Sequence, residues 1–141
     1  MRPVDIVKLY VGLANYGKVS NLKYTLTEDV PKEYEQFSKG ASYLTLETLS
    51  KVVRPGNEKL YSEQRPISWK TGTSYGLKDA WSVGVSPDYT VLVWLGNFNQ
   101  KSIFSLSGVE TAGNLLFKVF NIVDINSKPF SKPMDDLKEI E

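Results

Sequence analysis

The segment that most constrains the fold is AWSVGVSPDYTVLVWLGN, at positions 80–97. It consists of two apolar runs separated by Ser86-Pro87-Asp88, and a proline-led turn of this kind suits a β-hairpin. The second run has apolar residues on both faces of the strand: Val91, Val93 and Leu95 on one, and Leu92 and Trp94 on the other. Because a sheet that is apolar on both faces has to be covered on both, the sequence calls for helices above and below it.

Three segments have the apolar spacing of helices. The first spans about 3–16, with Pro3 in its first turn and Gly17 after its end; the second spans 42–53 and ends at an Arg-Pro-Gly sequence. The third lies within 107–123 and opens with a capping-box pattern from Ser107 to Glu110. Between the first two helices, YTLTED at 24–29 predicts a short strand and VPKEYEQFSKG a polar connection.

These elements predict an α/β protein of the α+β type, in which antiparallel strands are packed between helices on both faces of the sheet. The length of 141 residues indicates one domain. We expect positions 1–126 to form the folded part and 127–141, which are charged and interrupted by prolines, to form a tail or linker.

Composition excludes several classes of function. The chain has 17 basic and 16 acidic residues, so net charge gives it no attraction for nucleic acid. Its longest apolar run is far shorter than the ~20 residues that cross a bilayer, and we expect the chain itself to be soluble. It has no cysteine and no histidine, and we expect neither a metal nor a cofactor. Nucleophilic catalysis would then need a hydroxyl activated by a lysine or a carboxylate.

The candidate site is the stretch SWKTGTSYGLKDAW, at positions 68–81. The ammonium group of Lys70 supplies a fixed positive charge suited to a substrate carboxylate. Gly72 has no Cβ, so a substrate backbone could lie against this strand as an added strand, beside the hydroxyls of Thr71, Thr73 and Ser74. Taken alone, Lys70 is more simply interpreted as a solvated strand lysine, and only the flanking sequence favours a functional role. Lys78 and Asp79 can be interpreted as an exposed ion pair.

The triplet Lys70-Thr71-Gly72 matches the third motif of the serine acyl-transferases, which include the penicillin-binding proteins and class A β-lactamases. The likeness is much longer than the triplet. The segments WKTGTSYGLKDAWSVGVSPDYTVLVWLGN and LSGVETAGNLLFKVF resemble the transpeptidase domain of bifunctional penicillin-binding proteins of the 1C type, as do RPVDIVKLYVGLANYGK and LETLSKVVRPG. The resemblance extends to about Leu137 and implies the C-terminal half of that domain, in a β-lactamase/transpeptidase-like fold.

The resemblance implies a parent D,D-transpeptidase that cross-links peptidoglycan stem peptides through a serine acyl-enzyme and binds β-lactams. It implies catalytic roles for Lys70 and Thr73, the backbone N–H of Thr73 being an oxyanion-hole donor, and substrate binding by Thr71, Gly72, Thr73 and Ser74. It also implies a place on the periplasmic face of the bacterial inner membrane, held there by upstream segments. The family usually has arginine where Lys78 stands, which leaves the role of that position open.

Two of the family's three motifs are not found. The one S-x-x-K match, Ser20 to Lys23, follows a helix stop and does not open a helix, so we assign it no catalytic role; S-x-N is absent. We therefore expect the isolated chain to be inactive. Two alternatives stay open: a non-catalytic module that binds a carboxylate-ended peptide or pairs with another chain, and a likeness of fold alone with an unrelated ligand. An uncovered sheet face and edge also predict self-association.

Overall fold

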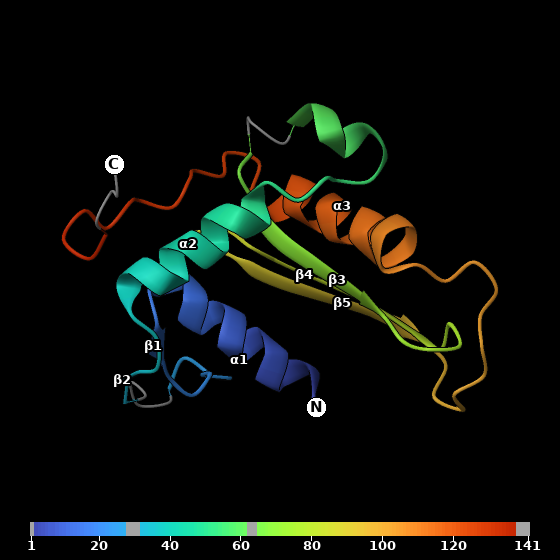
Figure 1. Cartoon of the computed structure of the whole chain (residues 1–141). Coiled ribbons are helices and arrows are strands. Elements are labelled where there is room, and N and C mark those ends of the chain that lie inside the picture. Colours follow the sequence, from blue (N-terminus) through green and yellow to red (C-terminus); the bar gives the residue numbers. More distant parts are fainter. Residues whose placement is uncertain (1, 28–31, 62–64, 138–141) are drawn as a thin grey trace.

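The computed structural model describes residues 2–27, 32–61 and 65–137 of the chain (Figure 1). These ranges contain α-helices, two antiparallel sheets and two short helical turns of other types. The elements are, in chain order, α1 (Pro3–Ala14), β1 (Lys18–Val19), β2 (Tyr34–Glu35), α2 (Lys39–Ser50), the 3₁₀ helix η1 (Gly56–Tyr61), β3 (Ser68–Thr73), β4 (Asp79–Val85), β5 (Thr90–Gly96), the π-helical turn η2 (Gly108–Gly113) and α3 (Asn114–Val123). No helix in the described ranges is long and apolar enough to span a bilayer.

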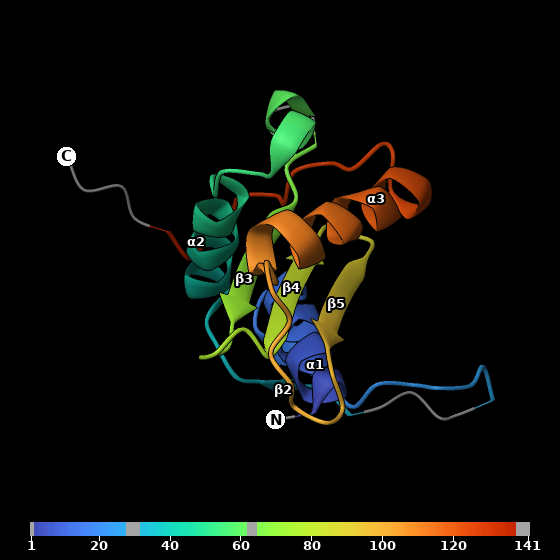
Figure 2. The ribbon, with the colours of Figure 1, turned by 90° about the vertical axis from the view of Figure 1, so that its right-hand side faces the viewer.

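The main sheet has the order β3-β4-β5, and both pairs of strands are antiparallel. The predicted hairpin is confirmed: the turn between β4 and β5 is closed by the Ser86 N–H, which donates to the Tyr89 carbonyl at 2.9 Å. Helix α3 lies on one face of this sheet and α1 on the other (Figure 2). The predicted fold class, an antiparallel sheet with helices on both faces, is therefore confirmed.

The core lies between the sheet and α3. Its buried residues come from the strands, from the loop before η2 and from one side of η2 and α3: Ile67, Trp69, Ala80, Val93, Leu106, Ala112, Leu116, Phe117 and Phe120. Gly84 on β4 allows the close approach of α3, because a Cβ at this position would lie 2.7 Å from Cε2 of Phe120. Because residue 84 has no side chain, α3 can pack directly on the backbone of the central strand.

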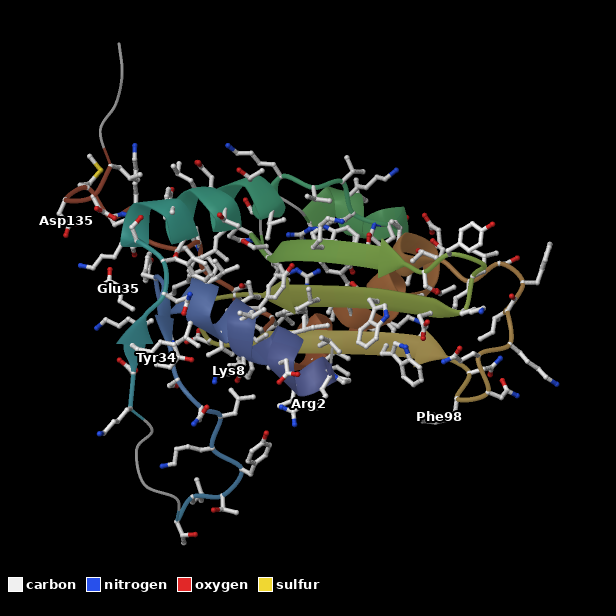
Figure 3. All side chains as sticks on the ribbon, turned by 60° about the horizontal axis from the view of Figure 1, so that its bottom comes forward. Arg2, Lys8, Tyr34, Glu35, Phe98 and Asp135 are labelled. Carbon is white, nitrogen blue, oxygen red and sulfur yellow. The ribbon has the colours of Figure 1, made fainter. Side chains whose placement is uncertain are left out.

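The opposite face of the sheet carries Trp81 and Trp94, which are directly opposite each other on β4 and β5. Their ring centroids are 6.0 Å apart, and the ring of Phe98 continues the row at 5.4 Å from Trp94. Helix α1 packs against β4 and β5 on this side. Phe98 lies past the end of β5 and is almost fully exposed, at 95% (Figure 3).

The first helix forms as predicted, although it ends at Ala14 rather than at about residue 16. Pro3 occupies its first turn, where a missing N–H costs nothing, and Asp5 bonds the Arg2 backbone at 3.2 Å. Gly17 ends the helical region with φ at +92°. A Cβ at Gly17 would lie 2.0 Å from the Phe37 carbonyl oxygen, so the chain can pass here only because residue 17 is glycine.

Three sequence expectations for the remaining elements were wrong. No strand forms at residues 24–27, and positions 28 and 29 of that predicted strand lie outside the described residues. The segment predicted as a polar connection instead contributes β2, which pairs with β1. Helix α2 begins and ends three residues before the predicted bounds, because the Ser38 hydroxyl caps it by accepting from the Ala41 N–H at 3.2 Å.

The C-terminal segment packs back onto the start of the chain. Phe130 meets the ring of Tyr16 edge to face at 6.4 Å, and the Tyr16 hydroxyl donates to the Ser131 carbonyl at 2.8 Å. The carboxylate of Asp136 accepts from the Gly40 N–H at 2.6 Å, in the first turn of α2. Asp135, labelled in Figure 3, lies 3.5 Å from the ammonium group of Lys39. The boundary predicted at residues 126/127 stays a prediction.

Replacing Asp136 with alanine is expected to lower the free energy of unfolding by about 1 kcal/mol, because the Gly40 N–H loses its acceptor at the positive end of α2. Chemical denaturation of the variant and the parent chain measures this difference. Asp135→Ala is the matched control, since its pair with Lys39 is exposed on both sides and contributes about 0–1 kcal/mol. Equal losses in the two variants would contradict the capping role of Asp136.

Candidate functional site

The five predicted site residues occupy the end of β3 and the position after it. Lys70, Gly72 and Thr73 are exposed, and Thr71 and Ser74 are half-buried. Side chains alternate along the strand, so Lys70 and Gly72 share the face of Trp81, while Thr71 and Thr73 share the face covered by η2 and α3. The predicted residues are therefore brought together on one strand, with the ammonium group and the hydroxyls on opposite faces.

The backbone at this end of β3 has unpaired groups at its outer edge. The Ser74 N–H donates to the Asp79 carbonyl at 2.9 Å, and the register runs without a break from there to Ser68. In an antiparallel ladder the hydrogen-bonded pairs alternate, so the N–H and C=O groups of Thr71 and Thr73 point away from β4. No strand of the described residues pairs with this edge. An extended peptide could therefore add to it.

Helix α2 and the segment after it close the first half of the same edge. The Ser68 hydroxyl donates to the Leu46 carbonyl at 2.6 Å, and Nε1 of Trp69 donates to the Val52 carbonyl at 3.1 Å. Both Ser68 and Trp69 are buried. Because these contacts stop at Trp69, the open part of the edge begins at Lys70.

The turn before α3 holds Thr73 in place. The Thr73 hydroxyl accepts from the Gly108 N–H at 2.9 Å, which leaves the hydroxyl proton to be donated elsewhere. A Cβ on Gly108 would lie 2.8 Å from the Gly72 carbonyl oxygen, so only glycine permits this approach. The predicted cap at Ser107 is also present, since its hydroxyl accepts from the Glu110 N–H at 3.1 Å. The start of η2 thus positions the hydroxyl of Thr73 at the edge of the sheet.

The cation of Lys70 is exposed and lies close to its own strand. Its Nζ donates to the Thr71 carbonyl at 2.6 Å, one of the outward-pointing groups of the edge. It forms no ion pair with any residue in the described ranges. An anionic group arriving at this edge would therefore meet a positive charge with no competing carboxylate.

Ser74 and Asp79 form the turn that follows the site. The Ser74 hydroxyl accepts from the Asp79 N–H at 2.8 Å, and the Asp79 carboxylate accepts from Nε1 of Trp94 at 2.9 Å. The alternative reading of Lys78 and Asp79 as an ion pair is wrong, because Asp79 is bound to the indole of Trp94 instead. In this structure Ser74 closes the turn, and its predicted part in substrate binding stays a prediction.

The S-x-x-K match does not reach the candidate site. Ser20 to Lys23 follow β1 and have no helical structure, as expected. Asn21 accepts from the ammonium group of Lys8 at 2.7 Å, beside α1. In Figures 1 and 3, β1 lies toward one end of the main sheet and the arrowhead of β3 toward the other. The structure therefore does not bring Ser20 together with Lys70.

A buried charged cluster supports the chain leading into β3, and the sequence analysis missed it. Arg54, only 1% exposed, donates to the Arg65 carbonyl, and its guanidinium carbon lies 4.9 Å above the Phe117 ring. Burial, together with the charge of Arg65, lowers the pKa of Arg54 to about 10, which leaves it charged at neutral pH. The carboxylate of Glu58 lies 2.7 Å from Nη2 of Arg65, and Asn121 bonds both. In the sequence, Arg54 belongs to an Arg-Pro-Gly segment that predicts the end of a helix and gives no sign of a buried charge.

The chain is similar to known proteins both in fold and in sequence. The structure matches the crystal structure of penicillin-binding protein 1A from Haemophilus influenzae with a TM-score of 0.70 at 15% identity, over 95% of this chain and 28% of that one. Penicillin-binding protein 1C of Escherichia coli (strain K12) is 30% identical over 119 residues, which are 84% of this chain and 15% of that protein. Penicillin-binding protein 4 of Bacillus subtilis (strain 168) is 32% identical over 121 residues, 78% of this chain and 19% of that protein. No family model matches the chain.

The structural match defines the class of fold: the described residues have the fold of part of a penicillin-binding protein. The sequence identities then show the family, and the chain belongs to the penicillin-binding proteins. It spans less than a fifth of the length of these curated relatives. The 1C subtype stays a prediction, because relatives named 1A and 4 are as similar to this chain as the relative named 1C.

Proposed function

We propose that the Lys70–Ser74 edge is one wall of a D,D-transpeptidase site. A stem peptide of peptidoglycan lies along β3 as an added strand, with its terminal carboxylate near the ammonium group of Lys70 and the hydroxyls of Thr71 and Thr73. The N–H of Thr73 then serves as one oxyanion-hole donor. The serine nucleophile and the second motif come from sequence outside these 141 residues, in a protein that works at the periplasmic face of the inner membrane.

The observation that carries this proposal is the geometry of Thr73. Its backbone N–H points away from β4, and its hydroxyl is held by Gly108 at 2.9 Å. Gly72 beside it is exposed and has no side chain that would obstruct a peptide backbone. Binding the carboxylate end of an extended peptide requires an outward backbone donor, a strand position without a side chain and a cation. Thr73, Gly72 and Lys70 supply these three features.

The test is intact-mass spectrometry after incubation with benzylpenicillin. The chain alone is expected to gain no mass, because no S-x-x-K serine faces the site. A longer polypeptide that adds the S-x-x-K and S-x-N motifs is expected to gain one penicilloyl group. If the chain alone forms an adduct that Ser20→Ala abolishes, the proposal that the nucleophile lies outside these 141 residues is refuted. If the longer polypeptide stays unmodified, the proposed transpeptidase activity is refuted.

A second candidate function is binding without chemistry, and the open edge favours it. Lys70 has no ion-pair partner among the described residues and the outward groups of Thr71 and Thr73 have no strand partner, so the site is accessible in the chain as it stands. NMR titration with a peptide ending in D-Ala-D-Ala distinguishes the two. Shifts confined to the amides of β3, in a chain whose longer form is never acylated, would favour the binding module.

A further inference from the structure

One peptide unit at the start of η2 connects the candidate site to the helix behind it. The carbonyl of Ser107 and the N–H of Gly108 belong to the same trans peptide bond, so they point in opposite directions. The N–H donates to the Thr73 hydroxyl at 2.9 Å, while the carbonyl points into the helical turn. A group that fixes this carbonyl therefore also fixes the donor that holds Thr73.

Three donors converge on the Ser107 carbonyl. The N–H of Thr111 donates to it at 3.0 Å and that of Ala112 at 3.2 Å. The bond from Ala112 spans five residues and is that of a π-helical turn, a feature found frequently at functional sites. The third donor is the Thr111 hydroxyl, which also accepts from the Ser107 N–H at 3.1 Å. A single hydroxyl thus binds the backbone of Ser107 on both sides of its Cα.

The Thr111 hydroxyl differs from an ordinary helical threonine. Thr45 and Thr48 on α2 also donate to the carbonyl four residues back, each at 2.8 Å, and both are exposed. Thr111 is half-buried, its hydroxyl accepts as well as donates, and the peptide unit that it holds continues to the buried Gly108. Water is therefore poorly placed to replace the bonds of Thr111, whereas it can replace those on α2.

We propose that Thr111 is a positioning residue of the site, acting on the Thr73 hydroxyl through the Ser107–Gly108 peptide unit. The Gly108 N–H occupies one lone pair of that hydroxyl, which leaves its proton for a substrate carboxylate at the open edge of β3. If the peptide unit rotated, the hydroxyl would lose this partner and could turn away from the substrate. The inference rests on the proposed transpeptidase site and adds to it a residue that does not contact the substrate.

Hydrogen exchange of the backbone amides in this chain tests the contact directly. Thr111→Val keeps the shape of the side chain and removes the hydroxyl. The Gly108 amide is expected to exchange about tenfold faster in this variant, while the amides of the β4–β5 hairpin keep the parent rates and report unchanged global stability. Thr45→Val is the matched control and should leave the exchange of Gly108 unchanged. The same result with Thr111→Val would overturn the proposal.

The rate at which benzylpenicillin acylates the longer polypeptide tests the effect on the site. Thr73→Val keeps the backbone N–H and removes only the hydroxyl. This variant and Thr111→Val are each expected to slow acylation by about tenfold or more, because small displacements of positioning groups raise the barrier. If Thr111 acts through Thr73, the double variant is no slower than Thr73→Val alone. Thr45→Val should react at the parent rate.

The outcomes separate this proposal from the proposed function. Losses that add in the double variant would overturn the role of Thr111, since it would then act by another route than Thr73. An acylation rate that Thr111→Val leaves unchanged would also overturn it, and the transpeptidase itself would stand. A longer polypeptide that stays unmodified would refute the proposed function and, with it, the role in the site given to Thr111.

Discussion

Glu58→Ala is expected to lower the free energy of unfolding by about 3–5 kcal/mol, because it removes the carboxylate that pairs with Arg65 and offsets the charge of the buried Arg54. The side chains of Arg65 and Glu58 are only 11% and 15% exposed, so solvent screens their pair weakly. Burial already lowers the pKa of Arg54, and the charge of Glu58 raises it, so losing Glu58 makes the charged form of Arg54 less favourable still. Urea denaturation followed by far-UV circular dichroism measures the loss.

The control is Glu47→Ala, the same truncation at a surface pair. Glu47 lies 3.6 Å from Lys51 on one turn of α2, and both side chains are largely solvated. Its loss should cost about 0–1 kcal/mol. If Glu58→Ala and Glu47→Ala were equally mild, the cluster around Arg54 would not stabilise the fold.

Lys70→Ala, in a longer polypeptide that benzylpenicillin acylates, is expected to slow acylation by about 10²–10³-fold, the range for loss of one preorganised electrostatic group. The ammonium group of Lys70 is exposed, and within the described residues its hydrogen bond is the one to the Thr71 carbonyl, in its own strand. Stopped-flow measurement of the second-order acylation rate gives the effect directly, and thermal melting of the variant checks that the fold is retained.

Lys78→Ala serves as the comparison for Lys70→Ala. Lys78 is also an exposed lysine, five residues past the end of β3, and its ammonium group pairs with no acidic residue in the described ranges. It should change the acylation rate less than about twofold, since long-range interactions between solvated charges are screened. A similar loss in the two variants would mean that Lys70 contributes only general positive charge.

The parts of the fold that the sequence predicted are those with local signals. The β4–β5 hairpin follows from two alternating runs and the proline turn at residues 86–88, and its strands meet at neighbouring positions in the chain. The first helix follows from Pro3 and Gly17, which mark its ends by backbone geometry alone. The hairpin and the first helix can therefore be predicted without knowing which other elements pack against them.

The parts that the sequence did not predict depend on distant partners. β1 and β2 are only two residues each and are paired across a long connection, so neither has a pattern of its own. Helix α2 begins earlier than predicted because the Ser38 hydroxyl caps it, and Val53, within the predicted range, lies beyond its end and is 71% exposed. The cluster around Arg54 brings together residues up to 67 positions apart, from Arg54 to Asn121, and no spacing rule reports such a contact.

The candidate site also contains residues with local sequence signals and residues whose role depends on a distant contact. Lys70, Thr71, Gly72 and Thr73 could be predicted because they are consecutive on one strand and match a known motif. Gly108 could not, although its N–H holds the Thr73 hydroxyl from 35 residues away. Gly108 has no distinguishing signal in the sequence. Glycine is needed there because a Cβ would lie only 2.8 Å from the Gly72 carbonyl oxygen, and that contact is visible only in the folded chain.

The contacts of the C-terminal segment also set an order on folding. The bond from Gly40 to Asp136 joins residues 96 positions apart, and that from Tyr16 to Ser131 joins residues 115 apart. While the chain leaves the ribosome, the β4–β5 hairpin can therefore close long before these bonds are possible. The junction between α1 and α2 is completed only when residue 136 has emerged, so during synthesis this corner becomes rigid after the β4–β5 hairpin.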